Sequence, residues 1–276
     1  MNSSTVIALG LALASTVLIN LAYLREHDAA AALPVLTIRR PVQSVRALLT
    51  DRSWLLGFGM ETTGFLLYVA ALRLASLALV QSVAAGGIGL LAYVSSRVAG
   101  RPLRVRERNG VLLSILGLAA LGVSLAGGSG EGRNGSTAVI TLWLVVIAAA
   151  AVSVVTLGRR MLGVAVVEGI AGGLFFSLGD VSTKVATQGG ARLVFVLPLI
   201  LGYTLGTWLL QLGYQRGGAL TVAGLATLLT NAVPIAAGTI VLDEPVPSGA
   251  YGALRILAFA AVTFGAILLA RPERSA

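Results

Sequence analysis

Nine apolar runs of about 20 residues each follow one another along this chain of 276 residues. A helix of about 20 apolar residues is long enough to cross the hydrocarbon core of a bilayer. The fold class predicted is therefore an all-α polytopic membrane protein. The nine predicted transmembrane helices cover residues 4–24, 54–73, 77–98, 109–127, 137–157, 162–182, 193–213, 219–240 and 250–270.

Composition supports this class and excludes several kinds of site. Hydrophobic residues make up 57% of the chain and charged residues 11%, against roughly 45–50% and about 25% in soluble proteins. There is no cysteine, and a single histidine, His27, cannot build a multi-histidine metal site. No phosphate-binding glycine loop or hydrolase motif is present. We therefore expect no cofactor, no resident metal and no enzymatic activity.

The basic residues predict the orientation. Of the 20 Lys and Arg residues, 15 fall in the segments after spans 1, 3, 5 and 7 or in the C-terminal tail. Since basic loops stay in the cytoplasm, the N-terminus is predicted outside and the C-terminus inside. The net charge of +9 then reflects topology and not nucleic-acid binding. The expected location is a bacterial plasma (inner) membrane.

Residues 26–53 are too polar to span the membrane. Behind Pro41, the apolar residues Val42, Val45, Leu48 and Leu49 recur at helical spacing. This pattern predicts an interfacial helix on the anionic inner leaflet, with a basic loop as the alternative. The glycine-rich stretch at 127–133 is predicted to be an external linker.

The second half of the sequence echoes the first. With a shift of 143 residues, Leu67 aligns with Leu210 and Arg73 with Arg216. We therefore divide the chain into a first repeat (1–127, spans 1–4), a linker with span 5 (128–161) and a second repeat (162–276, spans 6–9). This 4+1+4 order inverts the second repeat in the membrane, as in many secondary transporters. The alternative is that unrelated apolar helices merely look alike.

Four short segments carry a resemblance to a known family: 70–81 at the junction of spans 2 and 3, 106–118 at the entry to span 4, Ser182-Thr183-Lys184 in span 6, and Leu242-Asp243-Glu244-Pro245 before span 9. In order and spacing, the chain resembles the drug/metabolite transporter superfamily, in its EamA-like and NIPA-like branches. The resemblance implies an alternating-access transporter. Two features depart from the family pattern: Val233-Pro234 replaces a Glu-Pro pair in span 8, and nine spans replace ten.

Two acids are predicted inside the membrane. Glu61 lies roughly 10 Å into span 2 and Glu168 roughly 9 Å into span 6, at 1.5 Å per residue. Intramembrane carboxyl groups are costly and usually functional, so both are candidates for binding protons or substrate. Glu168 has an alternative role as a partner of Arg159 or Arg160.

Further polar residues are candidates for the same site. Asp180 and Lys184 are four residues apart on span 6, where they form either a substrate contact or an ordinary ion pair. Asn231 precedes Pro234 in span 8, where a proline suits either a broken-helix binding site or a simple kink. The remaining candidates, which interhelical hydrogen bonds would explain equally well, are Gln81, Gln211 and Thr204.

Three functions remain open. The first is a proton-coupled transporter of a small metabolite or drug. The second is a NIPA-like transporter of magnesium or another divalent cation, and the third is a membrane scaffold without transport activity. The expected partners are a small molecule or cation, protons and the lipid bilayer, with no nucleic acid; a homodimer is left open.

Overall fold

The computed structural model describes residues 3–37, 40–84, 87–98, 100, 102–125, 135–243 and 249–270. The described residues form helices and connecting turns, with no strand among them. The helices are α1 (Ser3–Ala32), α2 (Pro41–Thr50), α3 (Arg52–Leu74), α4 (Leu77–Ala84), α5 (Gly87–Val98), α6 (Val105–Leu125), α7 (Thr137–Leu157), α8 (Val164–Ala186), α9 (Val196–Tyr214), α10 (Ala219–Val241) and α11 (Ala250–Ala270), with short 3₁₀ helices η1 (Gly158–Arg160) and η2 (Gly190–Phe195). The predicted linker at 127–133, Glu244-Pro245 and the C-terminal tail lie outside the described residues.

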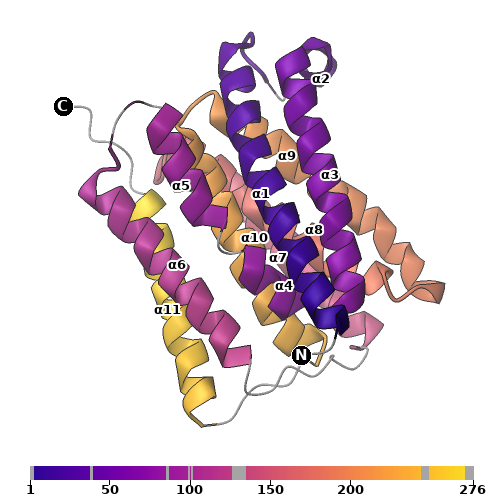
Figure 1. The fold of residues 1–276 in the computed structure, drawn as a ribbon. Coiled ribbons are helices and arrows are strands. Elements are labelled where there is room, and N and C mark those ends of the chain that lie inside the picture. Colours follow the sequence, from indigo (N-terminus) through magenta and orange to yellow (C-terminus); the bar gives the residue numbers. More distant parts are fainter. Residues whose placement is uncertain are drawn as a thin grey trace.

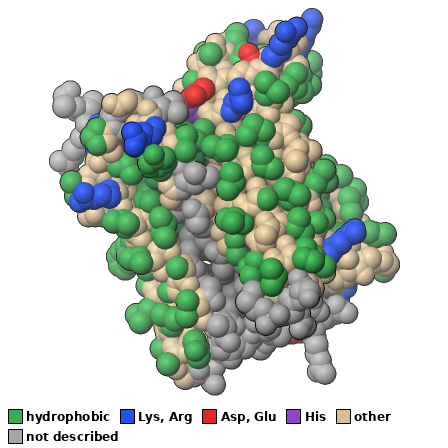
Figure 2. Space-filling view, in the orientation of Figure 1, with side chains coloured by type: hydrophobic (Ala, Val, Ile, Leu, Met, Phe, Trp, Pro, Cys, Tyr) green, Lys and Arg blue, Asp and Glu red, His purple; other side chains and the backbone are tan. Residues whose placement is uncertain are grey.

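Six helical segments in the described part of the chain are long and apolar enough to cross a membrane: α1, α3, α7, α8, η2 with α9, and α10. On the face shown in Figure 2, hydrophobic side chains cover the middle of the molecule. Most of the visible Lys and Arg side chains lie in the upper part of that view, at the end that carries α2 in Figure 1. These features support the predicted multi-pass membrane protein. The count of nine crossings and the 4+1+4 arrangement remain predictions.

Helix α1 continues past the predicted end of the first span, from residue 24 to Ala32. The segment 26–53 is therefore not a single interfacial unit, because its first residues belong to a long helix. The reason is that Glu26 is completely buried and accepts a hydrogen bond of 2.6 Å from Gln211 on α9. Four alanines then favour the helix up to its end, and Pro34 disfavours its continuation.

The helix predicted behind Pro41 is confirmed as α2, with Pro41 at its first position. Leu48 is buried, whereas Val42 and Leu49 are 79% and 52% exposed. The side chain of Asp51 then accepts a 2.8 Å hydrogen bond from the Trp54 amide and caps α3. The exposed apolar residues agree with the predicted interfacial helix, but contact with lipid stays a prediction.

The range 77–98, predicted as one span, contains two described helices, α4 and α5. Residues 85 and 86 between them lie outside the described residues. Each helix is too short to cross the hydrocarbon core alone, since a crossing requires about 20 residues. Helix α4 contacts α1 and α10, and α5 contacts α1, α6 and α10.

Helices α8 and α10 form the centre of the molecule, since most of their residues are buried. They pack against each other, while α1 packs on α3, α9 and α7 pack on α8, and α6 pairs with α11 (Figure 1). Glycines at 169 and 173 permit the close contact of α8 with α10. A Cβ atom on Gly173 would lie 2.8 Å from the Ala226 backbone, so this four-residue glycine spacing serves helix packing.

Candidate functional site

A cavity of about 300 Å³ lies between the helix group α1, α3 and α4 and the helix group α8, α9 and α10. Five of the predicted site residues line it: Glu61, Gln81, Asp180, Thr204 and Asn231. They come from five different helices, so the fold brings together residues that are up to 170 positions apart. No Lys, Arg or His is among the residues that line this cavity in the described part of the chain. Its two charged side chains are the carboxyl groups of Glu61 and Asp180.

Asp180 is held by donors from three other helices. Its Oδ2 accepts hydrogen bonds from Gln81 Nε2 at 3.0 Å and Thr230 Oγ1 at 2.7 Å, and its Oδ1 accepts one from Tyr203 Oη at 2.5 Å. A carboxylate has about four lone-pair sites, so three donors leave it nearly saturated. Such charge-assisted bonds stabilise a fixed negative charge inside the protein.

Four other oxygen atoms, each on a residue that lines the cavity, are buried without a hydrogen-bond partner. They are Glu61 Oε2, Asn20 Oδ1, Thr227 Oγ1 and Asn231 Oδ1. The amide nitrogens of the two asparagines each donate one hydrogen bond, to Thr16 O at 2.9 Å and to Thr227 O at 2.5 Å. A buried acceptor without a partner costs about 1–3 kcal/mol. A cation or its bound water would satisfy these atoms.

Helix α10 is continuous through Pro234, so the broken helix considered for this span is not seen. Asn231 is 1% exposed and reaches the cavity from an intact helix. The proline therefore does not create the site by unwinding the backbone.

Aromatic rings form much of the remaining wall. Phe65 and Tyr203 meet edge to face at 4.7 Å between ring centroids, and Phe176 lies 5.8 Å from Tyr203 and 6.4 Å from Tyr23. Sequence reasoning missed most of these rings and also missed Thr16 and Asn20 of α1. The four-residue spacing of Thr16 and Asn20, one helical turn inside an apolar span, was the available signal.

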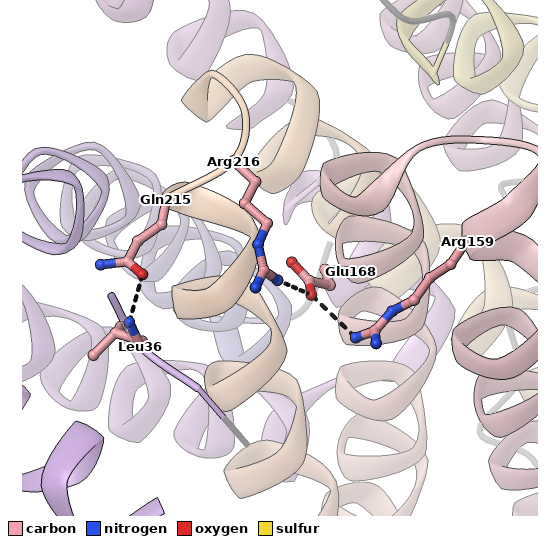
Figure 3. Close-up of polar contacts among 5 residues, drawn as sticks. All are labelled: Leu36, Arg159, Glu168, Gln215 and Arg216. Carbon is pink, nitrogen blue, oxygen red and sulfur yellow. Dashed lines mark hydrogen bonds and ion pairs between the residues drawn. The ribbon is translucent and has the colours of Figure 1, made fainter. Parts of the chain in front are cut away.

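Glu168 lies outside the cavity, in an ion-pair cluster (Figure 3). Its buried Oε1 accepts hydrogen bonds from Arg216 Nη1 at 2.7 Å and Arg159 Nη2 at 3.3 Å. The structure thus shows the predicted alternative, a pairing with Arg159, and adds Arg216. Glu168 joins η1, α8 and the turn after α9, and it does not line the cavity.

Gln215 precedes Arg216 in the turn after α9, and its side chain points to the opposite side of that turn (Figure 3). Its Oε1 accepts a hydrogen bond of 2.8 Å from the Leu36 amide, and its Nε2 donates to the carbonyl groups of Ala30, Leu33 and Pro34. One amide side chain therefore forms hydrogen bonds with backbone groups at the end of α1 and in the segment that follows it.

The last two predicted site residues also lie away from the cavity. Lys184 Nζ donates to the carbonyl oxygens of Leu72 and Ala75, each at 2.8 Å, and so binds the C-terminal end of α3. Gln211 is completely buried and donates to Glu26 Oε2. Glu26 was not predicted as a site residue, because the first span was ended too early. No group of three or more His, Cys, Asp or Glu residues in the described chain is arranged to hold a metal ion.

Comparison with curated proteins finds one similar to nearly the whole chain. The protein named "Probable magnesium transporter NIPA9" from Arabidopsis thaliana is 24% identical over 287 aligned positions, which cover 96% of this chain and 82% of that protein. No protein-family model matches the sequence, and no solved structure matches it.

Proposed function

We propose that this protein is a secondary transporter that carries a cation through the central cavity, with Mg²⁺ as the first candidate substrate. The observation that carries the proposal is the composition of the cavity wall. Glu61 and Asp180 line it with their carboxyl groups, three other lining residues each carry a buried oxygen without a hydrogen-bond partner, and no basic side chain lines it among the residues described. In a low-dielectric interior, uncompensated negative charge strongly favours a bound cation.

The choice of Mg²⁺ rests on the similarity to the magnesium transporter of Arabidopsis thaliana. Mg²⁺ binds oxygen atoms and keeps several of its waters. Six waters occupy about 180 Å³ at about 30 Å³ each, and the cavity of about 300 Å³ has room for such a hydrated ion. Asp180, already held by three donors, would attract the ion at a distance, whereas Glu61 and the two asparagines offer free oxygens.

The transport mechanism proposed is alternating access between two inverted repeats, 1–127 and 162–276. The packing supports it. The first and second helices of each predicted repeat pack together, as α1 with α3 and as α8 with α9. The last helices of the two repeats, α6 and α11, pack with each other. A cavity between the two groups would open to either side when one group rocks against the other. The proposed topology has the N-terminus outside and the C-terminus inside a bacterial plasma membrane.

The second candidate substrate is a small organic cation, such as a cationic metabolite or drug. The aromatic rings of Tyr23, Phe65, Phe176 and Tyr203 favour it, because ring faces attract organic cations. Both candidates require the two acids. They differ in whether the aromatic wall contributes to affinity.

The test is a flux measurement with the full chain reconstituted in liposomes that contain a magnesium-sensitive dye. We expect Mg²⁺ uptake that Asp180→Asn and Glu61→Gln each reduce at least tenfold. The matched control is Asp28→Asn, an exposed acid on α1, which we expect to retain wild-type flux. If organic cations enter and Mg²⁺ does not, the second candidate replaces the first. If folded protein moves neither, or if both cavity variants transport normally, the proposal is wrong and the scaffold hypothesis gains support.

A further inference from the structure

Glu26 and Glu61 lie together at the interface of α1 and α3. The Cγ atom of Glu26 lies 2.7 Å from where a Cβ atom would stand on Gly57. Gly57 and Glu61 are one helical turn apart on the same face of α3, so the stem of Glu26 packs directly beside Glu61. Their carboxyl groups are close enough for their charges to interact. The missing side chain at Gly57 is what permits this close approach.

The carboxyl groups of Glu26 and Glu61 differ in their access to the cavity. Glu61 lines the cavity, whereas Glu26 is completely buried and does not line it. One oxygen of each, Glu26 Oε1 and Glu61 Oε2, is buried without a partner. Gln211, also completely buried, donates to the other oxygen of Glu26 and keeps its own Oε1 without a partner. Tyr214 Oη, one turn further along α9, is likewise unpartnered.

Among the described residues, no cation neutralises this pair. Helices α4 and α10, which contact α1, contain no Lys, Arg or His. Arg97 of α5 lies over the ring of Tyr93, which is 58% exposed. His27 is paired with Asp28, and its ring packs edge to face on Tyr214. The other titratable groups that interact with the pair are Tyr23 and Tyr214.

We infer that Glu26 and Glu61 form a proton-binding site in which the two carboxyl groups share one proton. Two like charges this close in an apolar interior cannot both persist, so one group keeps a proton. A hydrated metal ion would not fit beside the Glu26 carboxyl group, because Glu26 does not line the cavity. A proton requires no such volume. The shared proton gives the pair one negative charge in place of two.

This site supplies a coupling mechanism, and that part of the inference rests on the proposed function. A cation that enters the cavity beside Glu61 favours its ionised form. The proton then leaves the pair, so that cation binding and proton release are linked. Return of the proton from the opposite side would reset the carrier. The structure thereby assigns protons as the coupling ion and Glu26 as the buried half of the exchange site.

The first experiment detects the proton without any substrate. Infrared spectroscopy of the purified full chain is expected to show the carbonyl stretch of a protonated carboxyl group at neutral pH. As the pH is raised, this band should disappear in Glu26→Gln, which removes the like charge, at a pH about 1 unit or more below that of the wild type. In Gln211→Leu, which removes the donor to the charged form, it should persist to higher pH. Asp28→Asn is the control and should match the wild type.

Size-exclusion chromatography and circular dichroism confirm that each variant is folded. If Glu26→Gln does not fold, Gln211→Leu tests the inference alone, because both carboxyl groups remain. Absence of the band in the wild type, or equal midpoints in wild type and folded variants, would overturn the inference.

The second experiment measures protons released when Mg²⁺ is added to weakly buffered protein with a pH dye. The wild type should release about one proton per bound ion, and Glu26→Gln should release less than half as much while still binding Mg²⁺. If the infrared band behaves as expected but Mg²⁺ neither binds nor releases protons, the proton site stands and the magnesium proposal fails. If Mg²⁺ binds and Glu26→Gln releases protons like the wild type, the coupling role is refuted.

Discussion

Gln81 donates a hydrogen bond to Asp180 across the boundary between the two helix groups that enclose the cavity. The Nε2 atom of Gln81 lies 3.0 Å from Asp180 Oδ2 and 2.8 Å from Tyr68 Oη. Gln81 is 2% exposed and Asp180 5% exposed, so both side chains are shielded from bulk water. A single buried amide on α4 thus links Tyr68 of α3 to the carboxylate of Asp180 on α8.

Replacement of Gln81 by leucine should destabilise the protein, because Asp180 loses one charge-assisted hydrogen bond. Such bonds contribute about 1.5–3 kcal/mol, so we expect a lower thermal midpoint in detergent. The matched control is Gln188→Leu, since Gln188 is exposed and bonds only to Arg192 at 2.6 Å among the contacts seen. Equal midpoints for the two variants would show that the link to Asp180 contributes nothing to stability.

The ion-pair cluster around Glu168 should respond unequally to the loss of its two arginines. Glu168 is completely buried, whereas the side chains of Arg159 and Arg216 are 39% exposed. Loss of an arginine leaves a buried charge behind, and removal of one partner from a buried pair costs about 3 kcal/mol or more; exposure of the arginines reduces this to about 2 kcal/mol.

We expect Arg216→Met to lower the unfolding free energy more than Arg159→Met, because its contact is shorter, at 2.7 Å against 3.3 Å. Glu168→Gln should cost less than Arg216→Met, since the freed arginines can reach water. Chemical denaturation in detergent, monitored by circular dichroism, measures this order. A larger loss for Arg159→Met would contradict it.

Two glycine-to-alanine changes should have opposite effects on stability. At Gly173 the new methyl group would lie 2.8 Å from the backbone of Ala226, so α8 and α10 must separate, at a cost of about 1–3 kcal/mol. At Gly59 nothing lies within 4 Å, and alanine favours a helix over glycine by up to about 1 kcal/mol. Thermal midpoints of the two variants should therefore fall on opposite sides of the wild type.

Thr230 and Thr204 both line the cavity but differ in their contacts. Thr230 Oγ1 donates to Asp180 Oδ2 at 2.7 Å, and Thr204 is exposed. We expect Thr230→Val to change the apparent affinity for the transported cation several-fold, because it alters the charge distribution on Asp180. Thr204→Val, which is isosteric and touches no carboxylate in the contacts seen, should change it less. Uptake kinetics in liposomes at varied cation concentration would compare the two.

The helical membrane class was predictable because long apolar runs report directly on the bilayer. The positions of α7, α8, α9 and α10 follow from run length alone and agree within a few residues. The ends of the first span could not be found in this way. Glu26 looks like a residue outside the membrane until its partner Gln211, 185 positions away, is known.

The candidate site was predictable only in part, for a related physical reason. Glu61 stood out because a carboxyl group inside an apolar helix is costly, whereas Asp180 was singled out by its spacing from Lys184. By the same criterion Glu168 was an equal candidate, yet its charge is balanced by Arg216 from a distant turn. Lys184 likewise binds the backbone at Leu72 and Ala75. Whether a polar group lines a cavity or forms hydrogen bonds with the end of a helix depends on packing between residues far apart in the sequence. This packing cannot be read from a single sequence.

The contacts of Gln215 bear on how the protein is made. The last turn of α1 depends on an amide that is synthesised 185 residues after Ala30. At about 5–20 residues per second, the ribosome reaches that amide roughly 10–40 s later. Until then the carbonyl groups at the end of α1 must be hydrated or held by the insertion machinery. Helix α1 is therefore made early and completed late, and a chain stopped before the turn that follows α9 would expose the end of α1 to quality control.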